Sequence, residues 1–151
     1  TYATTNGLGG AITGAEIVSG LHNVFPKVSA DAALLGTTEY QCVYLRNNHA
    51  TLTLLDALTL LSVNTNNTTT TVLIGLGTSG VGGTEQAIAD INTAPVGITF
   101  TESINDNLTI GDIPATSFMA VWLQRVIDPD TQASASDGIT IALRGITEAT
   151  L

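Results

Sequence analysis

The stretch that decides the fold of this chain reads FMAVWLQRVI and covers residues 118–127. Successive side chains of a strand point to opposite faces of a sheet, and here both faces are apolar. One face carries Phe118, Ala120 and Trp122, and the other carries Met119, Val121 and Leu123. Two explanations fit this pattern: a central strand covered on both sides within the chain, or a strand whose second face is buried by another subunit.

The segments around this stretch also favour strands. Apolar residues recur at every second position inside segments bounded by Gly, Pro, Asn and Asp. The other predicted strands cover residues 21–28, 38–47, 52–63, 69–76, 96–100 and 139–143. Short strands with few helical signals predict an all-β fold, with a two-sheet β-sandwich or jelly roll as the preferred architecture.

Two of these segments make specific predictions. In 38–47, Tyr40, Cys42 and Tyr44 alternate with Val43 and Leu45, so the two sets should face opposite sides of the sheet.

The leucines of 52–63 are ambiguous. Leu54, Leu55, Leu58 and Leu61 fit a helical spacing, and Leu52, Leu54, Leu58 and Leu60 fit a strand alternation. The threonine content and the lack of helix caps favour the strand, with Asp56 at a bulge that keeps its charge out of the core.

The N-terminal residues differ in composition from the rest. Residues 1–20 are rich in Gly, Thr and Ala, and their glycines are too dense for a stable helix or strand interior. We therefore expect an extended Gly-rich arm over 1–20, followed by a β-sandwich domain over 21–151. Within the arm, Thr13 and Glu16 have the spacing of a capping box, which predicts one short helical turn.

Composition and charge bound the function. A chain of 151 residues suits one domain with a core that needs no disulfide or metal. Thirteen acidic residues against four basic ones give a net charge of −9, which would repel a phosphate backbone, so direct nucleic-acid binding is not expected. No apolar run is long enough to span a bilayer.

Cys42 is the only cysteine, which excludes an intrachain disulfide and predicts a buried, unreactive thiol.

No motif for catalysis or cofactor binding stands out. The Gly-rich run GLGTSGVGG at 75–83 lacks the Gly-Lys-Ser/Thr of a phosphate-binding loop, and Lys27 is the only lysine. We interpret the run as a flexible or partner-contacting loop. His22 and His49 lie on separate segments without a Gly-x-Ser-x-Gly motif, and His49 is expected to cap or fill a turn.

Carboxylates flank two polar loops, and oxygen ligands of this kind suit Ca²⁺. They are Asp106 and Asp112 around one loop, and Asp128, Asp130 and Asp137 around the other. No EF-hand spacing is present, so we interpret them as solvated turn residues. The sequons that begin at Asn66, Asn67 and Asn107 matter only in a secretory compartment. We therefore expect no catalytic, cofactor or metal site, and no enzyme.

Four runs of the chain resemble small virion structural proteins of tailed bacteriophages. They are EYQCVYLRNNH at 39–49, IGLGTSGV at 74–81, GTEQ at 83–86 and DGIT at 137–140. The similarity covers nearly the full chain, from about Gly9 to the end. Proteins of this kind are small β-sandwiches that decorate capsids or form part of the tail and its appendages, assembling as homo-oligomers on the particle.

The resemblance implies a non-enzymatic capsid cement or decoration protein, made in the host cytoplasm and located on the virion. Its expected partners are the major capsid protein or other virion proteins and further copies of itself, with a trimer as the expected oligomer and no cofactor, nucleic acid or membrane. The candidate interface residues are Met119, Val121, Trp122 and Leu123, with Leu8, Ile12 and Ile17 on the arm. The acidic charge suits the outer surface of the particle.

Two alternatives remain open. One is a tail, baseplate or fibre-associated structural protein. The other is a carbohydrate-binding module at the virion surface, which would need exposed aromatic residues for stacking in a chain that is only 5% aromatic.

Overall fold

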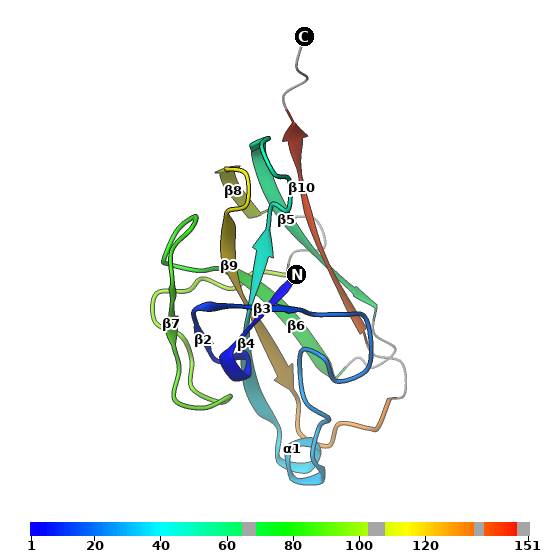
Figure 1. Cartoon of the computed structure of the whole chain (residues 1–151). Helices are drawn as coiled ribbons and strands as arrows, with labels where there is room; N and C mark the ends of the chain where they lie inside the picture. Colours follow the sequence, from blue (N-terminus) through cyan, green and yellow to red (C-terminus); the bar gives the residue numbers. More distant parts are fainter. Residues whose placement is uncertain (65–68, 103–107, 135–137, 148–151) are drawn as a thin grey trace.

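The computed structural model describes residues 1–64, 69–102, 108–134 and 138–147. These residues form a nearly all-β protein with antiparallel sheets and one short α-helix, which confirms the predicted all-β class (Figure 1). In chain order, the elements are β1 (Tyr2–Thr4), the 3-10 helix η1 (Thr5–Gly7), β2 (Gly9–Gly10), β3 (Ile12–Glu16), α1 (Ala30–Leu35), β4 (Thr37–Arg46), β5 (Leu54–Asn64), β6 (Thr70–Leu76), β7 (Glu85–Ala87), β8 (Leu108–Ile113), β9 (Phe118–Ile127) and β10 (Gly138–Thr147). None of the described helices is long and apolar enough to cross a membrane.

The larger sheet contains β9 at its interior, as the two apolar faces of this strand predict. Its order is β3-β1-β4-β9-β6, and β9 pairs with β4 from Thr37 opposite Ile127 to Arg46 opposite Phe118. One face of β4 and β9 contributes Tyr40, Cys42, Tyr44, Ala120 and Trp122 to one buried cluster, and the other contributes Val43, Leu45, Val121 and Leu123 to a second. The predicted alternation in 38–47 is therefore confirmed.

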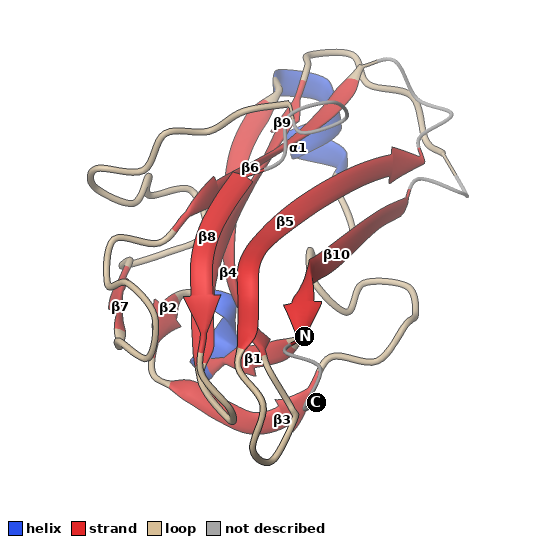
Figure 2. Cartoon of the chain, turned by 90° about the horizontal axis from the view of Figure 1, so that it is seen from above, coloured by secondary structure: helices blue, strands red, loops and turns tan. Residues whose placement is uncertain are grey.

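A three-stranded sheet, ordered β10-β5-β8, lies as a layer beside β4, β6 and β9 (Figure 2). The main hydrophobic cluster includes residues from both sheets, because Leu61 of β5 and Leu123 of β9 are both buried in it and Ile141 of β10 packs against it. The strand interpretation of 52–63 is confirmed. So is the bulge at Asp56, which has a φ of 49° and lies where the pairing of β5 with β8 shifts register.

The N-terminal segment does not form a separate arm beside the β domain. β1 pairs with β3 and β4 of the larger sheet, and β2 pairs with β7. The helical turn expected at 13–16 is wrong, because these residues belong to β3. Gly9 allows β2 to lie close to β7, because it has a φ of 87° and a Cβ there would lie only 2.0 Å from the Gln86 carbonyl oxygen. The glycines that argued against regular structure thus let the segment fold onto the sheet.

The strand predicted at 21–28 is wrong, because the described chain there forms turns and irregular backbone. Asn23 Nδ2 donates to the Val18 carbonyl at 2.8 Å and so closes a local loop. Phe25 is buried in the main cluster, and Val24 packs beside it. These apolar residues are anchored by packing rather than by a strand ladder.

The strand predicted at 96–100 reduces to one bridge between Ile74 and Thr101. The side chain of Gln86 occupies the place of a strand partner. Its Nε2 donates to the Val96 carbonyl at 2.7 Å, and the Val96 N–H donates to its Oε1 at 2.8 Å. Ile98 and Phe100 still pack against the buried cluster that contains Trp122. The apolar alternation therefore predicted which side chains face the core, but not the absence of a continuous strand ladder.

Candidate functional site

The outer face of the three-stranded sheet is the described surface best suited to bind another protein. In β5, Ala57, Thr59 and Leu61 point inward and are buried. Alternation therefore turns Leu58 and Leu60 to the opposite face, where both remain partly exposed and belong to none of the buried clusters. Within the described chain, this face of β5 is not covered by a second layer of apolar side chains.

The neighbouring strand extends this apolar face. Residues opposite one another in an antiparallel pair share a face of the sheet. We call the resulting set the outer stripe, and it consists of the cross-strand pairs Leu55–Ile146, Leu58–Arg144 and Leu60–Ala142. The side chain of Ile146 is 64% exposed.

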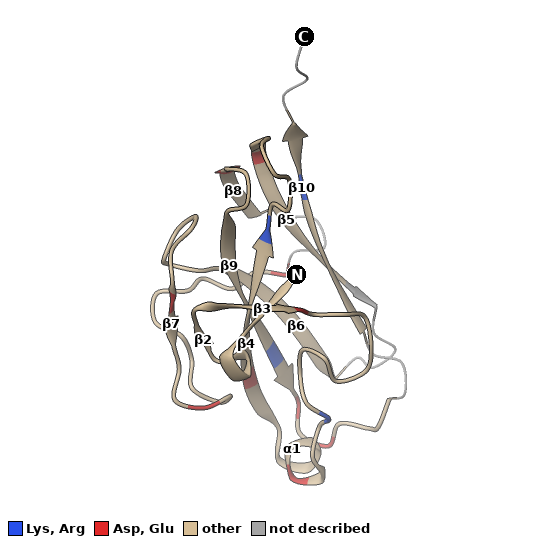
Figure 3. Cartoon of the chain, viewed as in Figure 1, with Lys and Arg blue, Asp and Glu red and all other residues tan. Residues whose placement is uncertain are grey.

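Charge is unevenly distributed with respect to the outer stripe. Arg144 is its only charged residue, although the whole chain carries −9. The nearby carboxylates Asp56 and Asp112 lie at the bulged end of β5 and β8, where Asp112 Oδ1 accepts a hydrogen bond from the Asp56 N–H at 3.0 Å. The other acidic residues that are drawn lie on several elements and loops (Figure 3). A largely apolar sheet face with a single cation, flanked by acidic groups, can exclude water against a partner.

The four candidate interface residues of β9 lie elsewhere. The side chains of Met119, Val121, Trp122 and Leu123 are at most 5% exposed, because other parts of this chain cover both faces of the strand. The main cluster covers Val121 and Leu123, and Met119 packs with Ala57 and Ile113. The covering segments for Trp122 come from the N-terminal strands and from residues 88–100. The first of the two explanations for the two-faced strand is therefore the one observed, and these residues present no surface to a partner.

The three candidate residues of the N-terminal segment also face the interior. Leu8 and Ile12 pack against the cluster that contains Trp122, and Ile17 packs against the main cluster. All three remain partly exposed at the edges of the core. The structure thus gives them a packing role within the chain.

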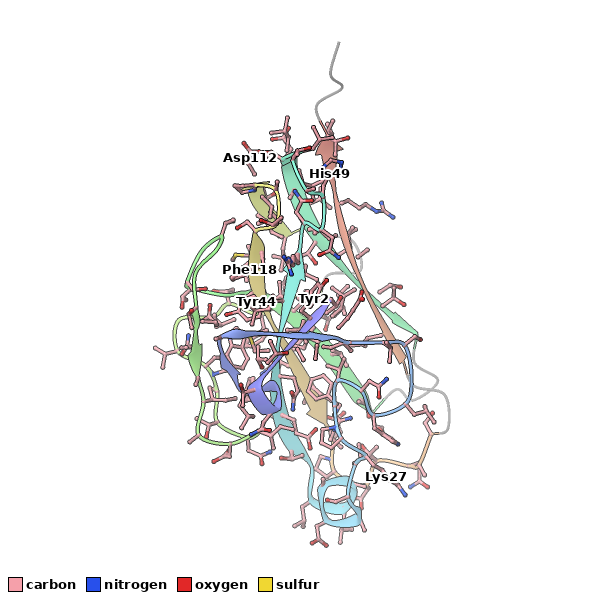
Figure 4. All side chains as sticks on the ribbon, viewed as in Figure 1. Tyr2, Lys27, Tyr44, His49, Asp112 and Phe118 are labelled. Carbon is pink, nitrogen blue, oxygen red and sulfur yellow. The ribbon has the colours of Figure 1, made fainter. Side chains whose placement is uncertain are left out.

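The chemically reactive side chains are dispersed over the described chain, and His49 has a local structural role. His49 Nδ1 accepts hydrogen bonds from the N–H groups of Thr51 and Leu52 at 3.1 and 2.9 Å, which confirms the predicted turn role. His49 and Asp112 lie at one end of the molecule and Lys27 lies toward the other (Figure 4).

No group of three or more metal-ligating side chains occurs among the described residues, which include Asp112, Asp128 and Asp130. Asp106, Asp137 and the sequon asparagines Asn66, Asn67 and Asn107 lie outside the described residues.

Cys42 is a core residue, as predicted. Its side chain is completely buried in β4. Burial raises the pKa of the thiol far above its ordinary value, and the nearby carboxylate of Glu85 raises it further. A thiol that stays protonated and buried is not available as a nucleophile.

The Gly-rich run at 75–83 folds around a carboxylate of its own chain. Glu85, at the start of β7, is buried and accepts hydrogen bonds from Thr78 Oγ1 at 3.1 Å and from the Ser79 N–H at 3.0 Å. Gly77 leaves room for this carboxylate, because a Cβ there would lie 2.2 Å from Glu85 Oε2. The Ser79 N–H that could have bound a phosphate therefore already holds an internal anion.

The backbone of Glu85 connects three segments that are distant in sequence. The Glu85 N–H donates to the Tyr44 hydroxyl at 2.9 Å, and that hydroxyl donates to the Gly10 carbonyl at 2.7 Å. Burial alone would raise the pKa of Glu85, but the hydrogen bonds from Ser79, Gln86 and Thr78 outweigh it, and the pKa lies below the ordinary 4.5. The network of hydrogen bonds that Thr78 and Ser79 donate therefore depends on an ionised Glu85 carboxylate.

Acid should weaken this network. Because the pKa of Glu85 is lower in the folded than in the unfolded state, its contribution to stability is present above pH 4.5 and is lost as the pH falls through the lower folded value. We expect Glu85→Gln to remove this part of the pH dependence. The measurement is the free energy of unfolding of both proteins at a series of pH values on either side of 4.5. Parallel profiles for the two proteins would contradict the assignment.

Comparison with protein-family models, with curated proteins and with solved structures finds no match for this chain. The function proposed for this chain therefore depends on its own surfaces. The outer stripe was not predicted from the sequence, although the signal for it was present. The leucines of 52–63 satisfied a helical and an alternating pattern together because this strand is apolar on both faces.

Proposed function

We propose that this chain is a non-enzymatic structural protein of a bacteriophage virion, a capsid cement or decoration protein that binds between major capsid subunits. The observation that carries the proposal is the outer stripe, an apolar face with one cation in a chain of net charge −9. The phage assignment itself comes from the sequence resemblance. His49 accepts backbone hydrogen bonds in a turn, and the Cys42 thiol is buried and protonated. Both observations support a binding role over a catalytic one.

The fold proposed for this role is a two-sheet β-sandwich, in which the five-stranded and three-stranded sheets enclose the main cluster. The proposed partner surface is an apolar patch of the capsid subunits with a carboxylate opposite Arg144. Standard interfaces bury roughly 800 Å² on each partner, so the outer stripe would form the apolar centre and the exposed threonines Thr109 and Thr140 would belong to the polar rim. The acidic remainder of the chain would be repelled by packaged DNA, which supports a position on the outside of the shell.

Repetition makes a modest contact effective. A decoration protein that assembles with copies of itself binds the shell at several points, and linked contacts give an avidity above that of any single one. We propose self-association on the particle, with the trimer as the form to test, and no cofactor.

The test is binding of the purified chain to capsids that lack it. We expect the double substitution Leu58→Thr and Leu60→Thr to weaken binding by about tenfold or more, since central apolar contacts dominate such interfaces. Threonine suits a strand, so the fold should persist, and an unfolding curve would verify this. The matched control is Val96→Thr, which changes an apolar side chain that is 79% exposed outside the three-stranded sheet. The control should bind as the unmodified chain does.

Three results would overturn the proposal. One is undiminished binding by the double variant, and another is absence of the chain from purified particles. The third is labelling of the chain on the tail, baseplate or fibres of intact virions, which would favour the alternative structural role.

A further inference from the structure

A hollow opens between the N-terminal segment, residues 17–26 and β4, separate from the outer stripe. Its volume is about 460 Å³, which lies within the range of roughly 300–1,000 Å³ that is typical of small-molecule sites. Its polar lining includes Asn6, His22, Asn23 and Gln41, and its apolar lining includes Val24 and Pro26. None of the residues that line it is Asp, Glu, Lys or Arg, although the chain as a whole is strongly acidic.

Gln41 is the most informative residue in the hollow. Its side chain lies on β4 and is only 7% exposed, yet its amide makes no hydrogen bond with any described residue. The polar atoms of Gln41 are not among the buried, unsatisfied atoms of the described chain, so water reaches this amide and a ligand could replace that water. Two other glutamines use their amides within the chain: Gln86 bonds to Val96, and Gln124 Nε2 donates to the Tyr40 hydroxyl at 3.2 Å.

The amide of Gln41 is also held in place. It lies directly over Gly7, where a Cβ would be 1.6 Å from Gln41 Oε1. Gly7 has a φ of 71°, so glycine suits this position both by its conformation and by its lack of a side chain. The turn of η1 therefore fits around the glutamine and leaves its hydrogen-bonding atoms beside the hollow.

Two further polar residues of the lining, Asn6 and His22, are exposed at its surface. Asn6 and His22 have positive φ angles of 58° and 61°, which are uncommon for residues other than glycine. Neither side chain hydrogen-bonds to another described residue. The hollow thus combines an unpartnered amide with an imidazole and a second amide.

This chemistry selects a class of ligand. Amides and an imidazole both donate and accept hydrogen bonds without charge, which matches the hydroxyl groups of a sugar. A phosphate or carboxylate would meet no lysine or arginine among the lining residues, and a purely apolar ligand would leave Gln41 unpaired. Val24 and Pro26 offer an apolar surface for the C–H face of a sugar ring. We propose that the hollow binds a neutral saccharide unit, oriented by the amide of Gln41.

This inference does not depend on the proposed role in the capsid. It also differs from the expectation that sugar binding would need exposed aromatic rings, because no aromatic residue other than His22 lines the hollow. Recognition would rest on hydrogen bonds rather than on stacking.

The test is an NMR titration of the full chain with neutral hexoses, N-acetylhexosamines and their disaccharides, up to tens of millimolar. We expect at least one of these sugars to produce saturable shifts at Asn6, His22 and Gln41. The substitution Gln41→Leu should weaken that binding by about tenfold, because it removes a donor and an acceptor at constant bulk. The matched control Gln124→Leu changes a partly buried glutamine of the neighbouring strand that lies outside the hollow, and it should leave the affinity unchanged.

A second variant keeps the test decisive if Gln41→Leu fails to fold. Asn6→Gly removes the other amide at a position whose positive φ suits glycine, so the fold should be retained while the affinity falls. Absence of saturable shifts for every sugar would overturn the proposal. So would competition by inorganic phosphate, or equal affinity in Gln41→Leu and in the control.

Discussion

Replacing Trp122 with alanine is expected to lower the free energy of unfolding by about 3–5 kcal/mol, which approaches the whole stability of many domains. Its indole is completely buried in the central strand β9, opposite Cys42 of β4 and Gly75 of β6. Alanine would leave a cavity that the paired strands on both sides cannot close. The measurement is urea unfolding followed by circular dichroism, because Trp122 is the only tryptophan and its fluorescence is lost with it.

A milder substitution separates volume from hydrogen bonding at this position. Trp122 Nε1 is buried and has no partner among the described residues. Trp122→Phe removes that unpaired donor and retains most of the apolar bulk, so we expect it to cost much less than Trp122→Ala. Equal losses in the two variants, or a loss below about 1 kcal/mol in Trp122→Ala, would contradict this account of the core.

The second large effect is expected at Arg125. Its Nε donates to Glu39 Oε2 at 2.8 Å, its Nη2 contacts the same oxygen, and Nη2 also donates to the Pro26 carbonyl at 2.9 Å. The guanidinium lies 4.6 Å from the centre of the Phe25 ring. Both charged side chains are nearly buried, at 12% and 10% exposure. Arg125→Met should therefore cost about 3–5 kcal/mol, because it leaves the Glu39 carboxylate without its partner.

A double-mutant cycle tests the origin of that cost. If the loss in Arg125→Met comes from the uncompensated carboxylate, the combined substitution Arg125→Met and Glu39→Leu should recover much of it. High salt should change the difference little, because a buried pair is screened less than an exposed one. Additive losses from the two substitutions would show that packing, rather than the ion pair, stabilises this region.

The two proposed binding surfaces are built from different elements, which allows them to be tested separately. The outer stripe belongs to β5 and β10, and the hollow belongs to the N-terminal segment, residues 17–26 and β4. Leu58→Thr with Leu60→Thr should leave the sugar titration unchanged. Gln41→Leu should leave capsid binding unchanged.

Local pattern predicted the strands well where a side-chain alternation coincided with a complete ladder. This holds for β4, β5, β6, β9 and β10, and for the bulge at Asp56. The pattern failed where another contact replaced the strand pairing. At Val96, the Gln86 side chain takes the hydrogen bonds that a neighbouring strand would make. The short helix α1 was missed because six residues show no helical period, even though Ser29 caps it and Gly36 ends it with a φ of 74°.

The candidate site was harder to predict than the fold. The sequence shows that β9 is apolar on both faces, and this pattern predicts interface residues on that strand. The structure covers that strand within the chain and leaves the outer face of β5 partly exposed. Gln41 gave no signal in the sequence, because its lack of a hydrogen-bonding partner depends on η1 and on residues 17–26, which lie far from it along the chain.

The amino-acid sequence by itself determined the all-β class, the alternation of the main strands and the burial of Cys42, because side-chain period and polarity act over neighbouring residues. Only the tertiary structure decided which apolar face is covered, since covering a face requires contact between segments that are distant along the chain. The N-terminal strands and residues 88–100 cover Trp122, and no comparable layer of described residues covers Leu58 and Leu60. Burial is a property of the assembled sheets, whereas alternation is a property of each strand.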